Sequence, residues 1–118
     1  MKIKLNICDR INLMGMLPNQ ADFADLIVAT NIRELIQFSS KEIDEFEIAK
    51  LPMQQVIEKN GEKNEKEFEL SQAEVDLIFK MLEKINSEKT MPVNSLFLKL
   101  VNKLGWEPGK INKIIGMK

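Results

Sequence analysis

The chain has 118 residues, of which 44% are hydrophobic and 30% are charged, and its net charge is −1. This balance is typical of one globular domain and argues against wholesale disorder. It provides no global positive field for binding nucleic acid or an acidic membrane surface. We therefore expect a single domain over residues 1–118, and the sequence leaves open whether residues 105–118 form a loosely attached tail.

The charges are distributed unevenly along the chain. Residues 1–10 carry a net charge of +2 and residues 97–118 one of +4, so the middle carries −7. An acidic centre and basic ends can attract each other within one fold or between subunits, and only the first explanation needs no partner. The single cysteine, Cys8, cannot form an internal disulfide, and we expect it to be buried in a reducing, cytoplasmic setting.

No segment of the sequence predicts membrane insertion. No apolar stretch reaches the roughly 18 residues that a spanning helix needs. The basic N-terminus is followed by only a short, interrupted apolar run, so it does not match a signal peptide. We predict a protein without a membrane partner, located in the cytoplasm.

The N-terminal part predicts a strand and a short helix. In residues 2–8, apolar Ile3, Leu5 and Ile7 alternate with polar side chains, which is typical of a half-buried strand. Asp9 is the predicted N-cap of a helix over residues 10–17, which Pro18 ends.

Residues 19–38 form the longest apolar-periodic run and predict the central helix of the fold. Asn19 is its expected N-cap, and Pro18 precedes it. Because the apolar side chains cover so much of the circumference, this helix must be covered on more than one side. We interpret it as a core helix, with the alternative that part of it faces a partner subunit. The apolar side chains recur at spacings of three and four: Phe23, Leu26, Ile27, Ile32, Leu35, Ile36 and Phe38.

The middle of the chain predicts a second helix and a β-hairpin. Ser39 and Glu42 form a capping box for a helix over residues 40–48. Residues 53–70 then contain two extended runs around the turn signal Asn60–Gly61. An isolated hairpin is only marginally stable, so it must pack on helices or pair with the N-terminal strand. The order of helix, tight corner, short helix and hairpin is that of a winged helix-turn-helix.

The C-terminal part predicts two amphipathic helices and a tail. Ser71 and Glu74 form the clearest capping box and open a helix over residues 72–86, and a second helix covers residues 92–104 and ends before Gly105. The complete fold class is therefore α+β and mostly helical, with four to five helices, an N-terminal strand and a hairpin. The tail is the most apolar segment outside this body, and it supplies the candidate partner-binding residues Trp106, Ile111, Ile114 and Ile115. The alternative is that the tail docks on its own core.

The residue types present provide little catalytic chemistry. The chain has no histidine and one cysteine, which excludes histidine-dependent nucleophilic triads and the usual Cys/His zinc sites. Glu65, Glu67 and Glu69 share one face of a strand, which favours a solvated acidic surface over a weak cation site. We predict no catalytic, cofactor-binding or metal-binding residue and no enzymatic activity. An enzyme that uses only carboxylates is the remaining enzymatic alternative.

Two stretches of the chain resemble small uncharacterised bacteriophage and prophage proteins. They are LPNQADFADLIVATNIRELIQFSSKEIDEF and ELSQAEVDLIFKMLEKIN, joined by a polar segment, and the resemblance spans about residues 13–88. It implies a viral or prophage accessory protein in the cytoplasm of a bacterial host, and it implies no catalytic residues.

We therefore predict a non-enzymatic protein that binds another protein or itself. The alternative is a winged-helix-like regulator that binds DNA. That alternative is disfavoured because the helix expected in the groove lies in KEIDEFEIAK, where four acids outnumber two lysines.

Overall fold

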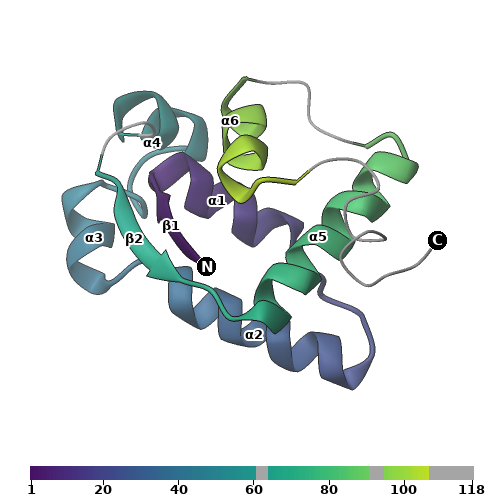
Figure 1. Cartoon of the computed structure of the whole chain (residues 1–118). Helices are drawn as coiled ribbons and strands as arrows, with labels where there is room; N and C mark the ends of the chain where they lie inside the picture. Colours follow the sequence, from purple (N-terminus) through teal and green to yellow (C-terminus); the bar gives the residue numbers. More distant parts are fainter. Residues whose placement is uncertain (61–63, 91–94, 107–118) are drawn as a thin grey trace.

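A computed structural model of the chain describes residues 1–60, 64–90 and 95–106 (Figure 1). The described elements are β1 (Lys2–Leu5), α1 (Ile7–Met16), α2 (Phe23–Ile36), α3 (Ser40–Glu45), α4 (Met53–Asn60), β2 (Lys66–Glu69), α5 (Gln72–Ser87) and α6 (Ser95–Leu104). The predicted α+β, mostly helical class is confirmed, although the described part contains six helices where four to five were expected.

The two strands come from distant parts of the chain. β1 and β2 pair antiparallel, with Lys2 opposite Glu69 and Lys4 opposite Glu67. Ile3 and Phe68 are paired on the other face, where both are buried. Opposite charges directly across a strand pair stabilise it, so the basic N-terminus neutralises the acidic strand within one fold.

The predicted hairpin is wrong in its first arm. Residues 53–60 form α4, whereas we expected an extended run there. The Pro52 carbonyl accepts hydrogen bonds from the amides of Gln55 and Val56, at 2.9 and 3.1 Å, and these bonds form the first turn. Met53, Val56 and Ile57 have helical spacing, and Val56 is fully buried. A winged-helix hairpin is therefore not formed by residues 53–70, because β2 pairs with β1.

Several element ends follow the predicted local chemistry. The capping boxes at Ser39–Glu42 and Ser71–Glu74 are both formed. Gly105 ends α6 with a left-handed φ of 72°, a conformation that glycine adopts without steric cost. The capping box of α1 is made by Asn6 and Asp9, so this helix begins earlier than expected. The helix α2 begins after Asp22, its N-cap, and not after Asn19.

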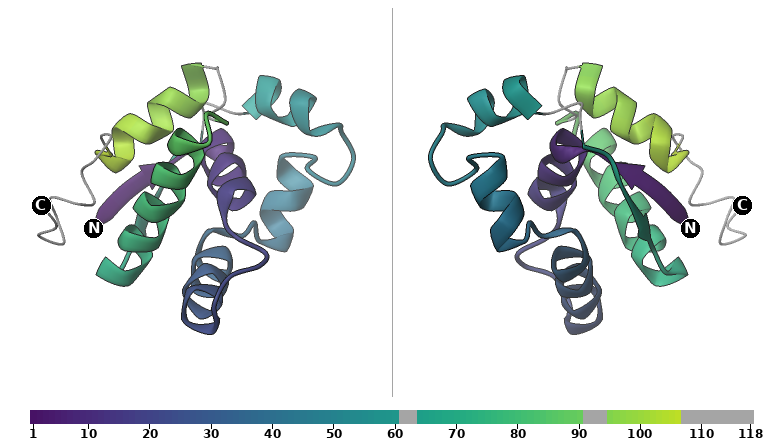
Figure 2. Two further views of the ribbon diagram at one scale, coloured as in Figure 1. Left: turned by 90° about the vertical axis from the view of Figure 1, so that its right-hand side faces the viewer. Right: turned by 90° about the vertical axis from the view of Figure 1, so that its left-hand side faces the viewer.

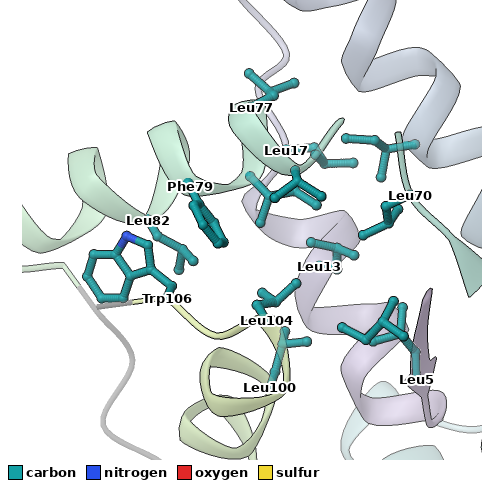
Figure 3. Close-up of a cluster of buried hydrophobic side chains, with 14 of the residues drawn as sticks. Leu5, Leu13, Leu17, Leu70, Leu77, Phe79, Leu82, Leu100, Leu104 and Trp106 are labelled. Atoms are coloured by element: carbon teal, nitrogen blue, oxygen red, sulfur yellow. The ribbon is translucent and has the colours of Figure 1, made fainter. Parts of the chain in front are cut away.

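The main core lies between α1, α5, α6 and the strands, with α2 on one side. Figure 3 shows leucines from β1, α1, α5 and α6 meeting there, together with Leu17 and Leu70, and Phe79 and Trp106 lie beside Leu82. A second, smaller cluster of buried side chains joins α1 to the α3–α4 region and contains Ile7, Phe46 and Val56. In each view of Figures 1 and 2, α2 lies at the lower edge of the molecule. Only one side of this helix faces the core.

Candidate partner-binding surface on α2

The helix α2 has one buried side and one exposed apolar side. Ala29, Ile32 and Ile36 are completely buried against the core. On the opposite side, Phe23 is 80% exposed and Ile27 is 46% exposed. A large apolar side chain left in water on a helix is unfavourable by the same effect that drives core burial. The exposed side is therefore the feature of the surface that most needs an explanation.

This outcome corrects the interpretation of α2 as entirely core. Phe23, Ile27 and Leu35 were expected to face the interior, yet each is exposed, Leu35 by 38%. The physical reason is that α5 covers α2 from one side, while α6 packs against α1 and β1. The alternative, in which part of this helix faces a partner subunit, stays a prediction.

A shallow hollow lies on the exposed side of α2. It has a volume of about 280 Å³ and is lined by Phe23, Leu26, Ile27, Thr30 and Asn31. None of these five side chains is charged. Four of them stand at positions i, i+3, i+4 and i+7, which is the arrangement that receives one side chain of a facing helix.

Polar contacts hold the C-terminal end of α2 in place. At its C-terminal end, the buried Arg10 of α1, only 1% exposed, donates Nε to the Ile36 carbonyl at 3.0 Å and Nη2 to the Gln37 carbonyl at 2.8 Å. Arg33 donates to the Pro18 carbonyl at 2.7 Å, in the loop before α2. Because these contacts hold α2 in position, the helix does not need apolar contacts on its exposed side to stay in place.

The Arg10 guanidinium also connects α2 to α3. Its Nη1 donates to a Glu42 carboxylate oxygen at 2.6 Å, and the ring of Phe38 lies 4.2 Å from its central carbon. The hydrogen bond from Arg10 holds the pKa of Glu42 at about 2, below the ordinary 4.5. Hydrogen bonds within the protein thus satisfy this buried charge on several sides.

A second buried acid is also fully engaged. Asp9, which is almost completely buried, accepts a hydrogen bond from Lys103 Nζ at 2.5 Å, and the same Nζ donates to Glu65 at 2.8 Å. Burial acts to lower the pKa of Lys103, but the hydrogen bonds to the two acids outweigh it, and the pKa is raised. Through Glu65, Lys103 of the basic C-terminal part thus pairs with the acidic centre inside one chain.

The acidic side chains of Glu65, Glu67 and Glu69, for which a weak cation site was the disfavoured alternative, lie next to lysines. Glu67 and Glu69 lie opposite lysines across the strand pair, and Glu65 is bound to Lys103. No group of three or more acidic or cysteine side chains in residues 1–60, 64–90 and 95–106 is arranged to hold a metal ion.

A groove between α1 and α5 is the second candidate surface. It contains two hollows, of about 580 and 420 Å³, which share Gly15, Met16 and Ile85. The position where a Gly15 side chain would begin has no atom within 4 Å. However, Lys84 and Glu88 line this groove, and its apolar side chains are half-buried. Its lining is therefore more polar than that of the α2 hollow, which has no charged side chain.

The predicted tail site is only partly within the described residues. Trp106 is 7% exposed and lies in the main core, where its indole N–H has no hydrogen-bond partner among the described residues. Ile111, Ile114 and Ile115 lie outside the described residues. The partner-binding role of these four side chains stays a prediction.

The groove-binding helix of the DNA-binding alternative corresponds to α3. In the structure this helix is six residues long and carries Glu42, Asp44 and Glu45 against Lys41. Its charge disfavours an approach to phosphates, and the alternative itself stays a prediction.

The chain was compared with protein-family models, with curated proteins and with solved structures, and no match was found in any of the three. None of the helices in the described part of the chain has the length and apolar character that crossing a bilayer requires.

Proposed function

We propose that this chain is a non-enzymatic protein that binds a protein partner, another protein or itself, through the exposed side of α2. The observation that carries the proposal is Phe23, an aromatic side chain that is 80% exposed at the rim of an uncharged hollow. Aromatic and aliphatic anchors at helical spacing are the residues by which a helix enters an apolar groove.

The buried charges of the described residues support a binding role over a catalytic one. Arg10, Glu42, Asp9 and Lys103 are each engaged by other groups of the protein. None of them lines the α2 hollow, whose polar side chains are the uncharged Thr30 and Asn31. We further propose an accessory protein of phage or prophage origin, acting in the cytoplasm of a bacterial host, on the basis of the sequence resemblance described above.

The test is capture of partners from bacterial lysate by the tagged full chain and by two variants. The double variant Phe23→Ser, Ile27→Ser removes the exposed anchors of α2. The matched control is Leu98→Ser, which changes a 54% exposed leucine on α6. We expect a stoichiometric protein partner, or untagged copies of the chain, to be lost with the double variant and retained with the control. Equal capture by all three proteins would overturn the proposal, and so would no capture by a wild type that also does not associate with itself.

A further inference from the structure

We infer that the exposed side of α2 binds a second copy of this chain, forming a weak, reversible, twofold-symmetric dimer. The inference rests on the proposed function and names its partner. In this dimer, Ile27 of each protomer enters the hollow on α2 of the other.

The exposed side of α2 is self-complementary, which favours a second copy of the chain as the partner. A twofold interface needs a projection and a recess at the same place on one surface, because each copy supplies both. The hollow on α2 is formed around Ile27 by Phe23, Leu26 and Thr30, and Ile27 itself is half exposed there. If two copies of α2 run antiparallel with the axis beside Ile27, each Ile27 meets the opposite hollow. Phe23 then covers Asn31 of the partner copy.

The distribution of charge around the hollow also favours a second copy of the chain as the partner. Two identical surfaces bring identical charges together, so a homodimer interface must avoid exposed charge near its axis. The hollow has no charged lining, and the neighbouring charges on α2 are already bound within the protomer. Lys80 of α5 contacts Asp25 at 2.7 Å, and Arg33 is held by the loop before α2. Glu34 lies two turns from Ile27, or about 10 Å along the helix, which is the Debye length at moderate salt.

The length of α2 limits how strongly two copies of the chain can bind each other. The helix α2 has 14 residues and is therefore about 21 Å long. Contact along one helix gives an interface at the small end of the specific range, which begins at about 1,000 Å². We therefore expect a dimer that dissociates on dilution, with a dissociation constant from about 10 μM to about 1 mM.

Sedimentation equilibrium of the purified full chain across this concentration range is the first test. We expect the mean mass to rise from monomer towards dimer, and we expect Ile27→Ser to weaken the association about tenfold or more. Leu98→Ser should leave the association unchanged. A wild type that is monomeric at all concentrations overturns the inference, as does an Ile27→Ser variant that dimerises like wild type.

Cross-linking tests the geometry. Helices packed 8–10 Å apart bring residues that face each other across the axis to within about 5 Å between Cα atoms, which suits a disulfide. Under mild oxidation, Ile27→Cys should therefore form a covalent dimer with itself. Leu98→Cys should not, and the wild type with buried Cys8 should not either. Equal cross-linking of both variants would reject the α2 interface.

The two proposals fail in different ways. If the chain is monomeric at all concentrations but loses another protein with the Phe23→Ser, Ile27→Ser variant, the binding function stands and its partner is not a second copy. If neither self-association nor capture depends on α2, the proposed function itself fails.

Discussion

The helices α2 and α5 lie side by side, but the fold holds them in different ways. Along its 16 residues, α5 buries Val75, Leu77, Ile78, Phe79 and Leu82, and none of its large apolar side chains is exposed. Among its 14 residues, α2 buries only Ala29, Ile32 and Ile36. Hence α5 is held mainly by apolar burial.

Polar contacts contribute much of the stability that α2 does not gain from apolar burial. Arg10 binds the carbonyls at its C-terminal end, Arg33 binds the loop before it, and Asp25 pairs with Lys80 of α5. The pair raises the pKa of Lys80 through its hydrogen bond to Asp25. A helix fixed at its ends by polar contacts is able to keep apolar side chains in water on its free side. This difference between α2 and α5 is what leaves apolar side chains exposed on α2.

The largest expected effect separates the two sides of α2. Ile32→Asp places a carboxylate in a fully buried position without a partner, and we expect it to lose about 4 kcal/mol or more, enough to unfold a small domain. The matched control Leu35→Asp lies on the exposed side and should change the unfolding free energy by less than about 1 kcal/mol. Urea unfolding followed by circular dichroism measures both values. If Leu35→Asp also unfolded the chain, the two-sided description of α2 would be wrong.

The next effect concerns the polar contacts that Arg10 and Arg33 make at the C-terminal end of α2. Arg10→Met removes a buried guanidinium and leaves Glu42 and two carbonyl groups without this donor, so we expect a loss of about 3 kcal/mol. Arg33→Met is the matched control, because its guanidinium is only partly buried and binds carbonyl groups in a surface loop. That variant should lose about 1 kcal/mol. Equal losses would show that burial of Arg10 does not set its contribution.

The sequence predicted best those elements whose local chemistry and burial agree. The clean amphipathic pattern of α5, its capping box and the Gly105 end of α6 were all predicted and are all present. A strand at the N-terminus was also predicted, over residues 2–8, and the structure has it over Lys2–Leu5. Its pairing with the second arm of the expected hairpin was one of two expected outcomes. In each case the local signal and the tertiary contact favour the same structure.

Other features depend on tertiary contacts that no local pattern reports. The apolar side chains around α2 predicted that other elements cover this helix. Which side is covered depends on where α5 and α6 pack. The helical spacing of Met53, Val56 and Ile57 after Pro52 was a usable signal for α4, and the turn signal at Asn60–Gly61 led to the hairpin prediction instead. No local pattern in the sequence identified Arg10 as a buried residue that binds both α2 and α3, because its hydrogen-bond partners lie 26 to 32 residues further along the chain.

The smallest expected effect is a pH dependence confined to the Arg10 side of α2. The pKa of Glu42 is lowered to about 2 from 4.5, chiefly by its hydrogen bond from Arg10. A lowered pKa in the folded state stabilises the fold above the unfolded-state value of 4.5, and this contribution is lost as the pH falls through about 2. We expect the wild type to lose on the order of 2 kcal/mol more than Glu42→Gln between these pH values.

The control for this pH effect is Glu47→Gln, because the pKa of Glu47 is also lowered, by a hydrogen bond from Lys59, but on the surface. Water screens that pair, so this variant should follow the wild-type pH profile closely. Hydrogen exchange then locates the effect: acid should loosen the last turn of α2, next to Ile36 and Gln37, before it loosens α5. Simultaneous loosening of both helices would mean that the Arg10 contacts do not anchor α2 separately, and the contrast between the two helices would then reduce to the amount of apolar surface each one buries.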